Sequence, residues 1–219
     1  ATRRKLGLIL KTHLVPTLGD LPISRLTPRL ILDAVRPAER RRHLDIAHRA
    51  KQLCGQVLRY AVATGRAEYD VTTTLRGALA PVARRHYAAP TTPAAAAALL
   101  EAIGTHPTDA SRDILTLLAL TFVRPGELRR AEWSEVDLER AVWRIPAAKM
   151  KMRTDHLVPL SRQALTILKA RPTRTGWVFP SPRDPKRPYS NMAMKQMLGT
   201  IGYRPAQITP HGFRAMART

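Results

Sequence analysis

The stretch AVWRIPAAKMKMRTDHLVPL, residues 141–160, decides the fold class of this 219-residue chain. Two short apolar runs, residues 142–145 and 157–160, flank a polar tip that is rich in cations. Short apolar runs on either side of a polar loop predict a β-hairpin. Elsewhere the apolar residues recur at the three-and-four spacing of helices. We therefore predict a mainly α protein with one small β-hairpin or sheet.

The tip of the predicted hairpin presents three cations, Lys149, Lys151 and Arg153. A flexible ammonium beside a phosphate can donate a proton to a leaving oxygen, a role that the permanently charged guanidinium of arginine fills poorly. A basic hairpin tip is nevertheless more often a solvated turn. The stretch by itself leaves both interpretations open.

Upstream of the hairpin, residues 118–133 read LALTFVRPGELRRAEW and place one arginine between two helices. An apolar helix ends near Arg124, and Pro125 opens a second helix at the position where a missing N–H costs nothing. A phosphate at this junction would meet both the guanidinium and the backbone donors of the new helix. Glu127 lies one turn further on and can hold Arg124 in place. An ordinary salt bridge between helices explains Arg124 equally well.

Downstream of the hairpin, residues 208–219 read ITPHGFRAMART. We predict that Thr209 caps a helix that Pro210 begins, so that His211 lies in the first turn and Arg214 one turn later on the same face. Imidazole exchanges protons near neutral pH, and guanidinium neutralises a phosphate oxygen. The pair suits phosphoryl transfer, although a lone His-x-x-Arg is usually a surface pair.

The N-terminal part of the chain, residues 14–87, reads as several short helices. Residues 14–23 indicate a turn-rich entry, and Thr27 followed by a proline marks a helix start. The longest helix is expected over residues 44–64, with Gly65 as its C-terminal stop. The apolar stripe predicted for this helix comprises Ile46, Ala50, Leu53, Val57, Tyr60 and Ala61.

Basic side chains cluster on and beside this longest helix. Solvation is the better interpretation for any single one, but the group as a whole favours contact with phosphates. The candidate DNA-binding residues of this half are Arg41, Arg42, Arg49, Lys51 and Arg59, to which the hairpin tip adds Lys149 and Arg153.

A change of composition divides the chain in two. The sequence becomes small and proline-containing around residues 88–93, and an alanine-rich helical pattern follows it. We therefore predict a helical domain over residues 1–87, a linker over residues 88–93 and a mixed α/β domain over residues 94–219. Two helices of the second domain are expected to begin at the caps Ser161 and Ser190.

Charge indicates the partner. The chain has 37 Lys and Arg residues against 16 Asp and Glu residues, a net charge of +21 with a pI near 11.5. An excess this large repels itself in the compact state unless a polyanion neutralises it, and nucleic acid is the commonest polyanion in a cell. Recognition of RNA by base stacking is disfavoured because only 5% of the residues are aromatic.

The single cysteine bounds the compartment. Cys54 cannot form a disulfide within the chain, and it lies in an apolar helical pattern that favours a buried thiol in a reducing environment. No apolar run approaches the roughly 18 residues of a membrane span. We therefore expect a cytoplasmic protein with no membrane partner.

Together and in this order, the three segments resemble the active-site motifs of the tyrosine recombinases, in particular the integrases of prophages and genomic islands. Residues 124–128, RPGEL, resemble the first active-site arginine with its accessory acid, and residues 211–214, HGFR, resemble the His-x-x-Arg box. The hairpin is similar to the one that bears the active-site lysine, a role that the register assigns to Lys151, with Lys149 as second choice. The resemblance makes the helical domain a core-binding domain and the mixed domain a catalytic domain.

The resemblance implies a site-specific recombinase that breaks and rejoins DNA through a 3′-phosphotyrosyl intermediate, without a metal or nucleotide cofactor. Arg124 and Arg214 would hold the nonbridging oxygens and stabilise the pentacoordinate transition state. Lys151 would protonate the departing 5′ oxygen, and His211 would assist proton transfer at the nucleophile. Glu127 would support them. The partners implied are double-stranded attachment-site DNA and, in the full-length protein, further copies in a homotetramer on that DNA.

The resemblance places the nucleophilic tyrosine some tens of residues beyond the His-x-x-Arg box. All five tyrosines of this sequence precede the box: Tyr60, Tyr69, Tyr87, Tyr189 and Tyr203. We therefore expect a C-terminally truncated fragment that binds DNA without cleaving it. The alternative is a non-catalytic basic DNA-binding protein, such as an integrase relic or a regulator.

Overall fold

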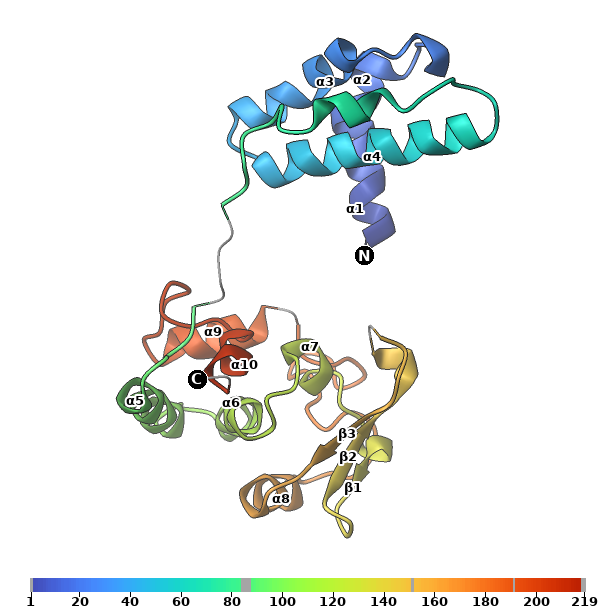
Figure 1. The fold of residues 1–219 in the computed structure, drawn as a ribbon. Helices are drawn as coiled ribbons and strands as arrows, with labels where there is room; N and C mark the ends of the chain where they lie inside the picture. The colour runs from blue at the N-terminus through green and yellow to red at the C-terminus, as the bar shows by residue number, and fades with distance from the viewer. Residues whose placement is uncertain (1, 84–87, 151, 191, 218–219) are drawn as a thin grey trace. The chain divides into compact units, whose positions relative to one another are not determined.

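The computed structural model describes residues 2–83, 88–150, 152–190 and 192–217. Contacts within the chain divide it into two compact units, residues 1–85 and 86–219 (Figure 1). The first unit is helical, and the second combines helices with one three-stranded sheet. The chain is therefore mainly α with a small β-sheet, as predicted. The linker over residues 88–93 stays a prediction.

The first unit begins with helix instead of the turn-rich entry expected over residues 14–23. Helical backbone runs without a break from residue 2 to residue 18, where Leu14 and Leu18 are buried and give this segment an apolar side to pack. The elements of the unit are α1 (Thr2–Ile9), a π-helical turn (Leu10–Leu14), α2 (Val15–Leu18), α3 (Pro28–Arg40) and α4 (Leu44–Ala63), with 3-10 turns over Ile23–Arg25 and Val71–Leu75.

The predicted ends of α3 and α4 are confirmed. The hydroxyl of Thr27 accepts a hydrogen bond from the backbone N–H of Leu30 (3.3 Å), which caps α3 as a threonine before a proline should. Helix α4 ends before Gly65, whose φ of +70° turns the chain away at little cost because glycine has no Cβ.

The apolar stripe predicted for α4 is partly wrong. Val57 and Tyr60 are 45% and 67% exposed, whereas Ala47, Cys54 and Leu58 are buried together with the expected Ala50 and Ala61. Helix α4 packs on α3, whose buried side chains include two alanines. Small residues let two helix backbones approach closely, and of the larger apolar residues of α4 it is Leu58 that is fully buried while Val57 and Tyr60 lie on the exposed side. Burial raises the pKa of Cys54 to about 11.

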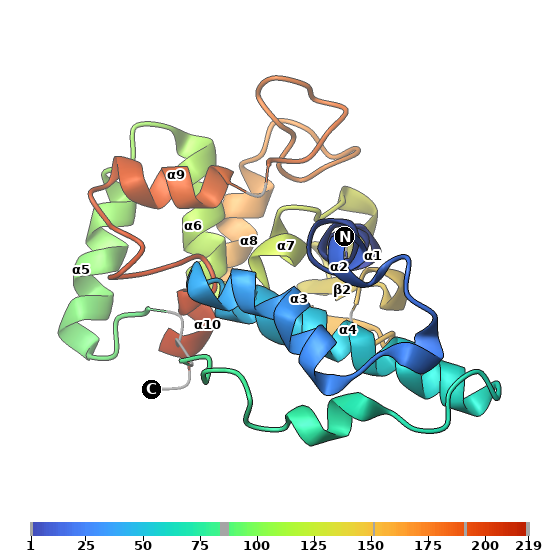
Figure 2. The same cartoon turned by 90° about the horizontal axis from the view of Figure 1, so that it is seen from above.

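The second unit is built around a central helix. Helix α6 lies between α5 and α8, and α9 also packs on it (Figure 2). The expected cap Ser161 accepts from the N–H of Ala164 (3.2 Å) and starts α8, but α9 begins at Ala193 and not at a cap on Ser190. The helices are α5 (Pro93–Gly104), α6 (Asp109–Thr121), α7 (Pro125–Leu128), α8 (Arg162–Lys169), α9 (Ala193–Thr200) and α10 (Gly212–Met216).

The sheet contains the predicted hairpin. Strands β2 (Val142–Ile145) and β3 (His156–Pro159) pair antiparallel, and β1 (Val136–Asp137) adds a short edge strand on the other side of β2. Trp143 and Ile145 face the core while the residue between them faces solvent, as the two-residue period of a strand requires. Strand β1 was not predicted, because a strand of two residues is too short to show an alternation of apolar and polar side chains.

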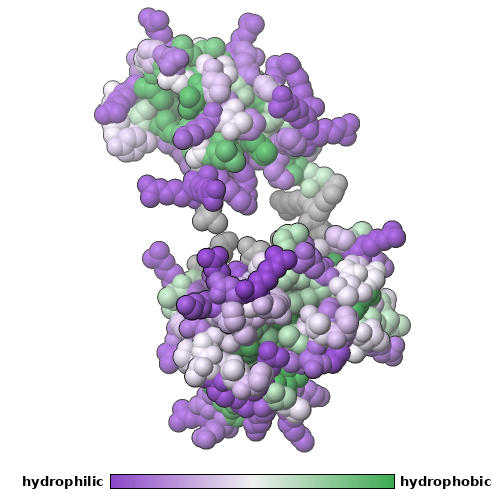
Figure 3. Space-filling view, turned by 180° about the vertical axis from the view of Figure 1, so that it is seen from behind, coloured by the Kyte–Doolittle hydropathy of each residue, from purple (hydrophilic) through white to green (hydrophobic). Residues whose placement is uncertain are grey.

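On the face seen in Figure 3, hydrophilic side chains cover much of each unit, and apolar patches lie between them. No helix in the described ranges is long and apolar enough to cross a membrane.

Candidate active site

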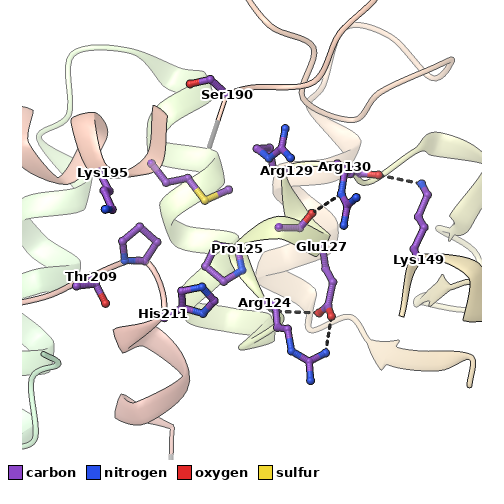
Figure 4. A pocket seen from close by; sticks show the side chains of 13 residues that line it. Arg124, Pro125, Glu127, Arg129, Arg130, Lys149, Ser190, Lys195, Thr209 and His211 are labelled. Carbon is purple, nitrogen blue, oxygen red and sulfur yellow. Dashed lines mark hydrogen bonds and ion pairs between the residues drawn. The ribbon is translucent and has the colours of Figure 1, made fainter. Parts of the chain in front are cut away.

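A cavity of about 570 Å³ opens in the second unit between α7, the start of α9, the hairpin tip and the segment before α10 (Figure 4). Five basic side chains and a single carboxylate line it, so the cavity is suited to an anion. The lining residues are Arg124, Pro125, Gly126, Glu127, Arg129, Arg130, Lys149, Ser190, Met194, Lys195, Thr209, Pro210 and His211.

Arg124 enters this cavity from the junction between α6 and α7. Helix α6 ends at Thr121, its C-cap Phe122 has a left-handed backbone with a φ of +50°, and Arg124 is the N-cap of α7. Glu127 accepts hydrogen bonds from the backbone N–H of Arg124 (2.8 Å) and from its Nη1 (2.7 Å). The carboxylate is 6% exposed and the arginine side chain 40%. Glu127 therefore fixes one edge of the guanidinium and leaves the rest accessible.

His211 reaches the cavity from the start of α10. The helix begins at Gly212, whose N–H donates to the carbonyl of Thr209 (2.7 Å), so the prediction that Thr209 caps the helix with its side chain is wrong. The carbonyl of Ala88 accepts from the N–H of Thr209 (3.1 Å). A Cβ on Gly212 would lie 2.2 Å from that same carbonyl oxygen. This close approach leaves no room for a side chain at residue 212, and local sequence rules do not reveal it.

Three of the other expected catalytic residues lie near enough to His211 to influence its pKa. Burial lowers the pKa of His211, the nearby guanidinium groups of Arg214 and Arg124 lower it further, and Glu127 opposes them. Arg214 does not line the cavity, but its Nη1 donates to the carbonyl of Phe122 (2.5 Å), two residues before Arg124. The structure thus brings Arg124, Glu127 and His211 into one cavity and places Arg214 beside it.

The described cations of the hairpin tip differ: Lys149 is bound to other parts of the chain, and Arg153 is exposed. Lys149 lines the cavity, yet its ammonium contacts Glu132 (2.6 Å), Glu135 and the carbonyl of Arg130 (2.9 Å). Arg153 is exposed. The expected catalytic Lys151 lies outside the described residues.

Sequence analysis missed further cations of the cavity. Arg129 donates from Nη1 to the carbonyl of Tyr189 (2.6 Å), and burial together with the charge of Arg130 lowers its pKa. Arg130 donates from Nε to the carbonyl of Gly126 (3.0 Å). Both arginines directly follow the RPGEL motif and could have been included by helical spacing. Lys195 comes some seventy residues later, and no local signal connects it to Arg124.

The candidate DNA-binding residues of the first unit fall into two groups. Arg59 pairs with Asp70 (2.9 Å), and the ammonium of Lys51 donates to the carbonyl of Leu75 (3.1 Å). The others are exposed and make no ion pair with another described residue: Arg41, Arg42 and Arg49. The two groups cannot be separated by sequence, because each consists of basic residues on or beside the same helix.

Within the described residues, the cavity holds neither a tyrosine nor a set of metal ligands. None of the tyrosines in these ranges lines the cavity, and Tyr87 lies outside them. In the same ranges, no group of three or more His, Cys, Asp or Glu side chains could hold a metal ion.

Comparison with known proteins identifies the class of both units. The family model described as "Phage integrase central domain" matches residues 1–78, and the one described as "Phage integrase family" matches residues 91–219. The chain belongs to the phage integrase family.

Relatives agree with this assignment. "Putative protein IntB" of Escherichia coli (strain K12) is 33% identical over 95% of this chain and 57% of its own length. The "Integrase" of Enterobacteria phage P4 is 30% identical over 95% of this chain and 51% of its own length. The chain therefore spans about half the length of the curated relatives it matches.

Solved structures share the fold. A lambda integrase dimer bound to a COC′ core site matches 99% of this chain and 77% of its own with a TM-score of 0.74 and 17% identity. A lambda integrase tetramer bound to a Holliday junction covers 99% of this chain and 65% of its own with a TM-score of 0.72, also at 17% identity. The Tn1549 transposon integrase in complex with a circular intermediate DNA matches 98% of this chain and 78% of its own, with a TM-score of 0.75 and 13% identity.

Proposed function

We propose that the chain is the core of a site-specific DNA recombinase that breaks and rejoins duplex DNA through a covalent link between a tyrosine and a 3′ phosphate. The observation that carries the proposal is the cationic cavity in which Glu127 orients Arg124 beside His211. Membership of the phage integrase family and the names of the relatives support it. The helical unit acts as the core-binding domain and the second unit as the catalytic domain.

In the proposed reaction a tyrosine oxygen attacks the phosphorus, and the bond from phosphorus to the 5′ oxygen breaks. Arg124 and Arg214 stabilise the negative charge of the pentacoordinate transition state, and Glu127 holds Arg124 in place. Lys151 gives a proton to the departing 5′ oxygen, and His211 assists removal of the proton from the nucleophile. The protein supplies these charges and protons with its own side chains.

DNA binding in this proposal uses exposed cations of both units. Arg41, Arg42, Arg49 and Arg153 contact phosphates, because their guanidinium groups are accessible. We leave Lys51, Arg59 and Lys149 out of this set because each already holds another part of the chain. A homotetramer on DNA in the cytoplasm is part of the proposal, and lambda integrase has been solved as a tetramer bound to a Holliday junction.

The test is a covalent-trapping assay on the complete gene product that contains these 219 residues. In attachment-site DNA with a nick beside the cleavage position, cleavage releases a short fragment that carries the 5′ hydroxyl. Without that hydroxyl the strand cannot be rejoined, so the covalent adduct accumulates and is visible on a denaturing gel. We expect an adduct with attachment-site DNA and none with a scrambled duplex. Specific binding without any adduct would instead favour a non-catalytic DNA-binding protein.

A further inference from the structure

One partly buried cation at the cavity has no part in the proposed reaction. Lys149 ends the 3-10 turn Ala147–Lys149 that follows β2, and its side chain is 25% exposed. Its ammonium donates to the carbonyl of Arg130 (2.9 Å) and forms ion pairs with Glu132 (2.6 Å) and Glu135. One side chain therefore joins the hairpin tip to the segment that follows α7.

The partners of Lys149 are themselves held in place. Glu135 is 6% exposed, and its second oxygen accepts from the indole Nε1 of Trp143 in β2 (3.1 Å). The ammonium also lies 5.6 Å from the ring centroid of Trp177, within the range of a cation–π contact. The backbone of Trp177 forms an isolated antiparallel β-bridge with that of Glu132. The cation thus sits in a preformed acidic and aromatic cage.

The segment that Lys149 anchors leads back to Arg124. Helix α7 has four residues, too few to be stable alone, so its direction depends on what holds its two ends. Glu127 fixes the N-terminal end by its bonds to Arg124. Lys149 reaches across to the carbonyl of Arg130 just beyond the C-terminal end (Figure 4).

Lys149 is poorly suited to be the proton donor itself. Burial alone would lower its pKa, but the hydrogen bonds and charges of Glu132 and Glu135 outweigh burial and raise the pKa above its ordinary value. An ammonium with a raised pKa gives up its proton less readily near neutral pH.

We propose that Lys149 is a positioning residue of the recombinase site, which ties the hairpin tip to the segment after α7 and thereby fixes Arg124 for the phosphate. The inference rests on the proposed function for its effect on DNA cleavage. The tie itself is a property of the free chain, so the two can fail separately.

The first experiment measures the tie by hydrogen exchange of the 219-residue chain without DNA. Lys149→Met is expected to speed exchange about tenfold or more in peptides from both residues 125–131 and the hairpin tip, because the two lose their common anchor. Lys149→Arg should retain most of the protection. The matched control is Lys169→Met, the same change at an exposed lysine in α8.

A second variant guards against unfolding. Lys149→Met alone leaves the buried carboxylate of Glu135 without its cation, which destabilises a fold. The double variant Lys149→Met/Glu135→Gln removes the charge as well and keeps an acceptor for Trp143. Unchanged exchange in both segments of this double variant would overturn the tie.

The second experiment measures cleavage by the complete gene product on nicked attachment-site DNA. Lys149→Met and the double variant should form adduct about tenfold to a hundredfold more slowly, since small misplacements at an active site have effects of this size. Lys149→Arg keeps the ion pairs and should restore most of the rate.

Two results would contradict the positioning role or its premise. If Lys149→Arg is as slow as Lys149→Met, and both recover on DNA with sulfur in place of the 5′ bridging oxygen, Lys149 is itself the proton donor. If the unchanged protein forms no adduct, the proposed function fails while the exchange experiment still decides whether the tie exists.

Discussion

Each unit of the molecule holds an arginine on a buried carboxylate, and the two pairs look alike locally. Arg59 lies 2.9 Å from Asp70 in the first unit, and Arg124 lies 2.7 Å from Glu127 in the second. The carboxylates are 8% and 6% exposed. Each also accepts a backbone N–H at the start of a helical turn, from Thr72 in one case and from Arg124 in the other.

The surroundings of the two pairs differ. A Cβ on Gly55 of α4 would lie 2.7 Å from the Oγ1 of Thr72 and 2.9 Å from the Nη1 of Arg59, so the end of the Arg59 side chain packs against the helix, although the side chain as a whole is 59% exposed and no cavity adjoins it among the described residues. Arg124 instead borders a cavity lined by further cations and by His211. An arginine–carboxylate pair becomes a candidate ligand site only where open space and additional cations adjoin it.

The largest expected difference between the pairs is in cleavage. Arg124→Met in the complete gene product should lower the rate of adduct formation about a hundredfold to a thousandfold, the cost of removing one donor that stabilises a transition state. Arg59→Met should leave the rate within a few-fold at temperatures where the protein is folded. Melting temperatures of both variants serve as the control, and an equal fall in cleavage for both would contradict the distinction.

The Arg59–Asp70 pair is expected to contribute to stability. Asp70 accepts hydrogen bonds from the N–H and hydroxyl of Thr72 as well as from Arg59. We therefore expect Asp70→Ala to lower the free energy of unfolding, measured with urea, by about 1–3 kcal/mol. Burial raises the pKa of Asp70, but these hydrogen bonds outweigh it and the pKa is lowered. The contribution is therefore present above the ordinary pKa of 3.8 and is lost as the pH falls through the lower folded value. If the difference in free energy of unfolding between the unchanged protein and Asp70→Asn stayed constant down to acid pH, this linkage would be refuted.

Salt dependence sharpens the comparison among the cations of the first unit. If about six phosphates are neutralised, log affinity for duplex DNA should fall with log salt at a slope near −5. Arg42→Gln and Arg49→Gln should each make the slope less steep by about 1. Arg59→Gln should change it less, because Asp70 already neutralises that guanidinium. Fluorescence anisotropy at several salt concentrations measures the slopes, and equal changes for all three would place Arg59 among the DNA contacts.

The smallest expected effect is the titration of His211. Burial and the charges of Arg214 and Arg124 lower its pKa below 6.5, so the free chain holds this imidazole neutral at neutral pH. Protonation in the folded state is disfavoured, and His211 therefore lowers stability as the pH falls below 6.5. Arg214→Met should raise the pKa, as should a bound DNA phosphate. NMR titration with His211→Gln for assignment checks this, and a pKa insensitive to both changes would separate His211 from the site.

Local rules predicted the elements that local contacts decide. Four confirmed features depend on residues that lie close together in the sequence: the hairpin, the cap at Thr27, the cap at Ser161 and the Arg124–Pro125 junction. The failures have distant causes. Thr209 does not cap α10, and its backbone N–H and Gly212 both meet the carbonyl of Ala88, which is far away in sequence.

The sequence by itself determined the mixed fold, the surplus of cations and the three motifs, because spacing, turn residues and charge are written along the chain. Tertiary structure decided which acid each of these cations meets and which of them borders a cavity. Arg59 and Lys149 are bound to acids that approach from other segments, whereas Arg124 keeps one edge of its guanidinium open to a cavity. The strength of an ion pair depends on the position and burial of its partner, and only folding sets these.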